Sequence, residues 1–137
     1  MPTNTTPIFP AVIITPSVQI LPADVSNYKT VVIAGANGSR LDNLICTSDD
    51  TSARVLQFAI NDGATDYVLG QVNIPLTSGI DGAGTVKGVS IINSINFPGI
   101  KDDGAIYLKA SYTLKVKSLT TVTSAKQINI IGFGGDY

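Results

Sequence analysis

One stretch near the C-terminus limits the fold more than any other feature of the chain. From residue 106 to residue 117, side chains of two kinds alternate without a break. The apolar or small row is Ile106, Leu108, Ala110, Tyr112, Leu114 and Val116, and the other row is Tyr107, Lys109, Ser111, Thr113, Lys115 and Lys117. Alternate residues share one face of a β-strand, whereas a helix repeats every 3.6 residues. Residues 105–119 are therefore predicted to form one long strand, with the row that begins at Ile106 facing a core.

The rest of the chain favours the same class of structure. Ile, Thr and Val are abundant, and these β-branched residues suit a pleated, half-buried surface. All ten acidic residues are Asp, which is typical of turns, and none is the helix former Glu. Further strands are predicted at residues 28–34, 40–48, 53–60, 67–74 and 126–133, and residues 85–97 fit either a strand or a short helix. The expected fold is all-β, an antiparallel jelly roll or β-sandwich of seven to nine strands, with a small barrel also admissible.

Three of these segments carry finer expectations. Leu41 and Leu44 cannot share one face of a regular strand, so a β-bulge is expected near Asp42 and Asn43. The sequence Asn61-Asp62-Gly63 predicts a hairpin between the strands on either side of it. In the returning strand, residues 67–74, alternation predicts that the inward side chains are Val68, Val72 and Ile74.

Residues 1–27 differ from the remainder, and we interpret them as an extended Pro-rich arm that precedes a domain at residues 28–137. Five prolines recur there, and each one fixes its own φ and biases the preceding residue to extended geometry. Two interpretations remain open: edge strands of the same domain, or an arm that reaches a neighbouring subunit. In the second case the candidate residues for contact with a neighbouring chain are Ile8, Phe9, Val12 and Ile14.

The sequence offers little for catalysis or for a metal. It contains no His, the usual general base and the commonest metal ligand, and its single cysteine, Cys46, is expected to be a small core residue. Neighbouring carboxylates at residues 49–50 and 102–103 point apart on an extended chain, and turn chemistry explains them, as it does the calcium candidates Asp62, Asp66 and Asp81. The glycine-rich residues 34–40 precede a strand, not the helix that a phosphate-binding loop requires. We expect no enzyme activity, no cofactor and no metal.

The charge and hydropathy pattern also narrows the partners. Net charge is −1 and the nine Lys and Arg are scattered, so no nucleic-acid footprint is expected. The longest apolar run is only residues 11–14, far too short to cross a bilayer, and no basic and apolar leader opens the sequence. Neither a membrane nor nucleic acid is an expected partner. Synthesis in the cytoplasm is expected.

Three stretches together resemble a known family. They are TVVIAGANGSRLDNLICTSDDTSARVLQFAIND at residues 30–62, IYLKASYTLKVKS at residues 106–118 and GFGGDY at residues 132–137. This pattern is similar to that of the small jelly-roll decoration proteins, also called cement or head-stabilising proteins, on the capsids of tailed bacteriophages. The resemblance covers most of residues 28–137 and leaves out the Pro-rich arm. It transfers no functional residue, because the family acts through surfaces.

The resemblance implies a structural role in a virion. It implies a protein that binds the outside of an assembled phage head and stabilises the head by bridging neighbouring major-capsid subunits. The implied partners are the major capsid protein and further copies of the chain, as a dimer or trimer. The alternative is a binding module of a phage tail or fibre that recognises a host glycan or protein.

Overall fold

The computed structural model describes residues 10–101 and 104–137. Ile8, Phe9 and the pair at residues 102–103 lie outside the described residues. Ten strands are present in the described part of the chain, three of them only two or three residues long, where the sequence predicts seven to nine. They are β1 (Val12–Ile14), β2 (Ser17–Ile20), β3 (Lys29–Ile33), β4 (Ser39–Ser48), β5 (Arg54–Asn61), β6 (Asp66–Ile74), β7 (Val89–Ser90), β8 (Ile106–Leu108), β9 (Thr113–Ser118) and β10 (Ile128–Asp136). One 3₁₀ turn, η1, spans Pro22–Asp24.

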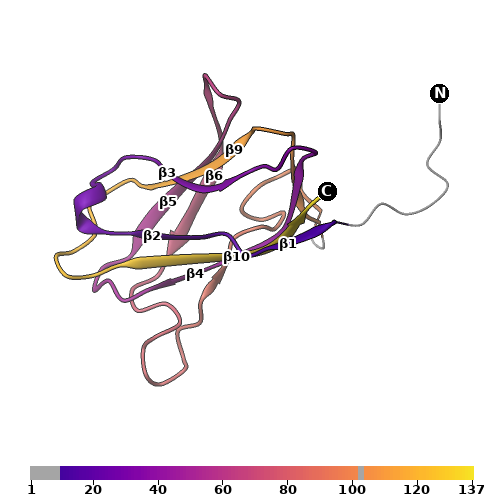
Figure 1. The fold of residues 1–137 in the computed structure, drawn as a ribbon. Helices are drawn as coiled ribbons and strands as arrows, with labels where there is room; N and C mark the ends of the chain where they lie inside the picture. The colour runs from indigo at the N-terminus through magenta and orange to yellow at the C-terminus, as the bar shows by residue number, and fades with distance from the viewer. Residues whose placement is uncertain (1–9, 102–103) are drawn as a thin grey trace, which may run out of the picture.

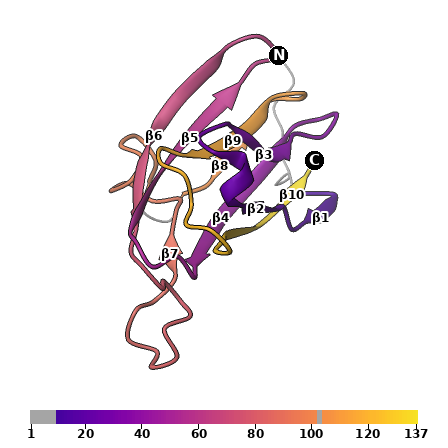
Figure 2. The same ribbon diagram turned by 90° about the vertical axis from the view of Figure 1, so that its left-hand side faces the viewer.

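The strands form two antiparallel sheets that pack face to face (Figure 1). Sheet A has the order β1-β10-β4-β7, with β2 also paired to β10 and β8 to β4. Sheet B has the order β3-β9-β5-β6. Early strands therefore pair with late ones: β2 with β10, β3 with β9, and β4 with β7 and β8. This nesting is the jelly-roll form of the β-sandwich, and it confirms the predicted fold class. In Figure 2 the long connection between β6 and β7 projects away from the two layers.

The prediction of one long strand over residues 105–119 is wrong in one respect. The stretch forms two strands: β8 pairs with β4 in sheet A, and β9 pairs with β3 and β5 in sheet B. The chain changes sheet at a turn in which Ser111 has a φ of 68°. The inward row still holds, because Leu108, Leu114 and Val116 are all buried. Both sheets face the same core, so the alternation continues although the strand does not.

The expected bulge in β4 is confirmed. Phe133 of β10 pairs with Asn43, and the next residue, Gly134, pairs with Leu41, so that Asp42 is the extra residue. The extra residue restores the phase, and both Leu41 and Leu44 are fully buried. A side chain on Gly134 would have its Cβ 2.0 Å from the Arg40 carbonyl oxygen, which explains the glycine opposite the bulge.

The hairpin between β5 and β6 is also confirmed, since Asn61 pairs with Asp66. The inward row predicted for β6 is only partly right. Val72 and Ile74 are buried, but Val68 is 58% exposed. The register shifts where Phe58 pairs with Gly70 and Ala59 with Val68, so that Leu69 is an extra residue in β6. The bulge moves Val68 to the outer face.

Residues 85–97 follow neither of the two predicted patterns. Only β7 is a strand, and turns and bends make up most of the rest. Ile91, Ile92 and Phe97 are nonetheless buried, and the Phe97 ring meets Phe58 edge to face with centroids 5.8 Å apart. The segment closes one end of the core without regular secondary structure.

An ion pair lies at the crossing from sheet A to sheet B. Asp50, fully buried between β4 and β5, accepts a hydrogen bond of 2.7 Å from Nε of Arg54. It also accepts bonds from the backbone N–H and the hydroxyl of Thr123, at 3.1 and 2.6 Å. Burial opposes ionisation of Asp50, but these hydrogen bonds outweigh it and hold its pKa well below the usual range. The pair ties the β4–β5 turn to the loop before β10.

The described part of the N-terminal arm is joined to sheet A. β1 and β2 both pair with β10, and Ile20 at the end of β2 is buried in the core. The pairing is that of the edge-strand interpretation. Two glycines in β10 allow close packing here. A Cβ on Gly135 would lie 2.3 Å from Pro10, and one on Gly132 would lie 2.5 Å from the Leu44 side chain and 3.0 Å from Pro16. The division into an arm at 1–27 and a folding unit at 28–137 stays a prediction.

Candidate interaction surface

The outer face of sheet A carries a group of four exposed apolar side chains on three adjacent strands, β1, β4 and β10. The inward residues of β10 are Ile128 and Ile130, which are buried, so Asn129, Ile131 and Phe133 point outward. Ile131 pairs directly with Ile45 of β4, and Ile13 of β1 pairs with Gly135 on the same outer face. Ile13 is 88% exposed, Ile131 and Phe133 45% each, and Ile45 39%. We call these four residues the sheet A patch.

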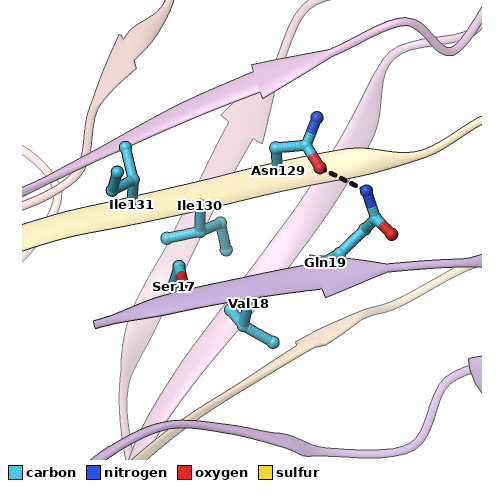
Figure 3. A pocket seen from close by; sticks show the side chains of 6 residues that line it. All are labelled: Ser17, Val18, Gln19, Asn129, Ile130 and Ile131. Atoms are coloured by element: carbon cyan, nitrogen blue, oxygen red, sulfur yellow. Dashed lines mark hydrogen bonds between the residues drawn. The ribbon is translucent and has the colours of Figure 1, made fainter. Parts of the chain in front are cut away.

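A shallow groove of about 560 Å³ lies beside the sheet A patch, over the paired strands β2 and β10 (Figure 3). Its lining is Ser17, Val18, Gln19, Asn129, Ile130 and Ile131. A hydrogen bond of 2.8 Å from the Gln19 side-chain nitrogen to the Asn129 side-chain oxygen spans the two strands. None of the lining residues is charged, so the groove extends the patch with neutral polar groups.

The nearest charged side chains on this face lie at the end of the sheet A patch. Arg40 and Asp42 form an exposed ion pair of 2.7 Å beside the bulge of β4. Asn43, opposite Phe133, has its side chain hydrogen-bonded within the protein. Its side-chain nitrogen donates to the Ser90 hydroxyl at 2.8 Å, and its side-chain oxygen accepts from the backbone N–H groups of Leu44 and Ile92. The sheet A patch therefore offers shape and apolar area, and contributes no charged group for a ligand.

The structure describes two of the four predicted contact residues, Val12 and Ile14, both in β1. Ile14 packs partly against the core, whereas Val12 is 58% exposed. Ile8 and Phe9 lie outside the described residues. Since no partner chain is present, the contact role of all four stays a prediction.

Sequence reasoning missed Ile13, Ile45, Ile131 and Phe133. A signal for two of them is visible in residues 128–133, Ile-Asn-Ile-Ile-Gly-Phe, where apolar residues occupy both faces of a strand. A strand with water on one side is expected to alternate apolar with polar residues. The double-sided pattern is the sequence signal for exposed apolar side chains on the outer face of β10.

The groups considered for chemistry all have structural roles in the described residues. Burial raises the pKa of the Cys46 thiol to about 12, so this cysteine is an inert core residue. Asp62 and Asp81 each accept backbone N–H bonds within their own turns, from Ala64 and Thr65 and from Gly84, Thr85 and Val86. The described part of the chain has no cluster of three potential metal ligands. It also has no helix with the length and hydropathy to span a membrane.

Comparison with known proteins shows the fold. The sequence matches no protein-family model and no curated protein. The structure is similar to a chain of the acidic stable capsid structure of Helicobacter pylori bacteriophage KHP30, with a TM-score of 0.57 and 7% identity over 91% of this chain and 88% of that one. It is also similar to the Drosophila NLP core, whose crystal structure provides insight into pentamer formation and histone binding. The TM-score is 0.50 and the identity 12%, over 91% of this chain and 99% of that one. At such low identity, the likeness is one of fold.

Proposed function

We propose that this chain is a structural virion protein that binds the outside of an assembled phage head and stabilises it by bridging neighbouring major-capsid subunits. The observation that carries the proposal is the sheet A patch, an apolar and uncharged surface on a rigid jelly roll. Solvent-facing positions in central strands are usually polar, and a grouped apolar face marks a protein contact. The fold likeness to a chain of a phage capsid structure and the sequence resemblance to decoration proteins support a virion as the setting.

The mechanism needs no chemistry beyond binding. A protein that binds only the assembled lattice stabilises the assembled state by mass action, because dissociation of the shell must also release the bound protein. A jelly roll suits this role because its two sheets pack against each other, which gives the protein a rigid surface. The contacts are assigned to the sheet A patch and to Ile8, Phe9, Val12 and Ile14, with a head subunit or a sister copy as their partner.

The test is sedimentation of purified protein with phage heads that lack it. The proposal expects saturable binding at a fixed ratio to the major capsid protein, and heads that resist heat or chelator better once decorated. Binding to tails, fibres or host cells with none to heads would contradict it and favour the tail-module alternative.

A further inference from the structure

The sheet A patch needs a cover of a particular kind. Ile45 and Ile131 form a directly opposed cross-strand pair, and Phe133 follows two residues along β10 on the same face. Together with Ile13 they form an apolar strip bordered by the neutral groove over β2 and β10. A cover that fits this strip is apolar, narrow and without charged side chains, because a buried unpaired charge costs several kcal/mol.

Residues 1–9 of the chain have this composition. The segment is Met-Pro-Thr-Asn-Thr-Thr-Pro-Ile-Phe, with no charged side chain and with Ile8 and Phe9 at its end. Nine residues span at most about 30 Å when extended, which exceeds the width of one sheet of four strands spaced about 4.8 Å apart. The segment can therefore lie along the whole strip.

The strand direction indicates which copy the segment covers. β1 is antiparallel to β10, with Val12 opposite Asp136 and Ile14 opposite Gly134. Followed toward the N-terminus, the chain therefore runs past the end of β10 and away from Ile131 of the same molecule. Pro10 lies against Gly135 at that end, and a proline biases the residue before it to extended geometry. At Pro10 the chain therefore points away from the apolar strip of its own molecule.

We propose that residues 1–9 of one copy dock on the sheet A patch of a second copy, with Ile8 and Phe9 covering Ile131 and Phe133. The inference rests on the self-association part of the proposed function and names its two surfaces. The contact is heterologous, since the arm of one copy meets the patch of the next, and repetition closes into a ring when the rotation permits. On a head, linked copies would bind with added avidity.

Disulfide cross-linking between differently tagged copies tests the geometry. One copy carries Phe9→Cys and the other Ile131→Cys, and the native Cys46 is buried and does not compete. The expected product is a covalent dimer that contains one copy of each. The control replaces the second variant with Lys117→Cys, on the outer face of sheet B, and should give little product. Cross-linking of Ile131→Cys with itself would instead show two patches face to face, and would overturn the proposal.

A chain carrying both Phe9→Cys and Ile131→Cys separates contact between copies from contact within one. Covalent dimers or larger species are expected at micromolar concentration. A closed monomer alone would overturn the proposal, because it places the arm on its own patch.

Sedimentation equilibrium without heads gives the strength of the contact. Deletion of residues 1–9 and Ile131→Ser should each weaken self-association at least about tenfold, the effect of losing one buried large apolar side chain. Val68→Ser, at an exposed apolar position on sheet B, should leave self-association unchanged, and circular dichroism checks that each variant is folded. If the unmodified protein stays monomeric, this inference is wrong, even if the protein binds heads. If the protein self-associates but does not bind heads, only the proposed function is wrong.

Discussion

The two sheets bury similar inner faces, but their outer faces differ. Sheet B presents polar groups that satisfy one another: Lys115 lies 3.6 Å from Asp66, and Lys117 lies 4.6 Å from the centre of the Tyr28 ring. Gln71 donates to Gln57, and Gln57 donates to the Tyr28 hydroxyl. The exposed apolar side chains of sheet B include Ile33 and Val68, which lie apart on its two edge strands, β3 and β6. Sheet A instead exposes Ile13, Ile45, Ile131 and Phe133 on the adjacent strands β1, β4 and β10. This difference in grouping is the reason for proposing a protein contact on sheet A and not on sheet B.

This comparison assumes that the inner faces alone maintain the fold, and β9 tests that assumption with the largest expected effect. Leu114→Asp places a charge in the core, at a cost of several kcal/mol against a total stability of about 5–15 kcal/mol. We expect loss of soluble folded protein. Lys115→Asp, the next residue and on the outer face, should remain folded. Similar yields and similar circular dichroism spectra for the two variants would mean that the register of β9 is wrong.

The ion pair at the crossing between the sheets should have the next largest effect. Arg54→Met leaves the carboxylate of Asp50 buried without its main partner, which should cost about 3–5 kcal/mol in urea unfolding. Arg40→Met breaks the exposed pair with Asp42 and should cost less than about 1 kcal/mol. Equal losses in the two variants would contradict the structural role of the buried pair.

The same pair predicts a pH dependence. The folded pKa of Asp50 is depressed, so its contribution is present above the unfolded pKa, near 4, and is lost as the pH falls toward the folded value. The unfolding free energy should therefore decrease below about pH 4. Asp50→Asn should show a flatter decrease than the parent protein over pH 4 to 2. Parallel curves would mean that other carboxylates cause the acid sensitivity.

Substitutions at two glycines of β10 allow the interior of sheet A to be compared with the edge formed by the N-terminal strand. Gly134→Ala forces a Cβ against the backbone oxygen of Arg40 in β4, which is held on both sides, and should cost about 1–3 kcal/mol. Gly135→Ala meets Pro10 and the backbone oxygen of Val12, which belong to the edge of the sheet and are held on one side only, and it should cost less. Thermal melting of both variants checks the order. The reverse order would mean that the N-terminal edge is as firmly held as β4.

The smallest effects on stability are expected on the outer faces. Ile131→Ser and Val68→Ser should each change the unfolding free energy by no more than about 0.5 kcal/mol, as surface substitutions do. The two should differ in head binding, which we expect Ile131→Ser to weaken and Val68→Ser to preserve. Equal head binding by both variants would remove the distinction between the sheets.

The sequence by itself determined the features that depend on neighbouring residues. Period two over residues 106–117 correctly placed Leu108, Leu114 and Val116 in the core, and the change of phase between Leu41 and Leu44 predicted the bulge near Asp42 and Asn43. Such patterns are local because a strand turns successive side chains to opposite faces. The predicted fold class follows from them, together with the abundance of β-branched residues and turn-forming aspartates.

Only the tertiary structure decided which strands meet. The alternation of apolar and polar residues indicates only which side chains face the core. Because both sheets face the same core, the pattern continues through the turn at Ser111, although β8 and β9 join different sheets. The exposure of Val68 depends on a bulge that becomes visible only in the pairing of β6 with β5. The sheet A patch likewise depends on pairing. Ile45 adjoins Ile131 only because β4 pairs with β10, and Ile13 joins the same face only because β1 pairs with β10 at Gly135. These contacts are long-range, and no local pattern encodes them.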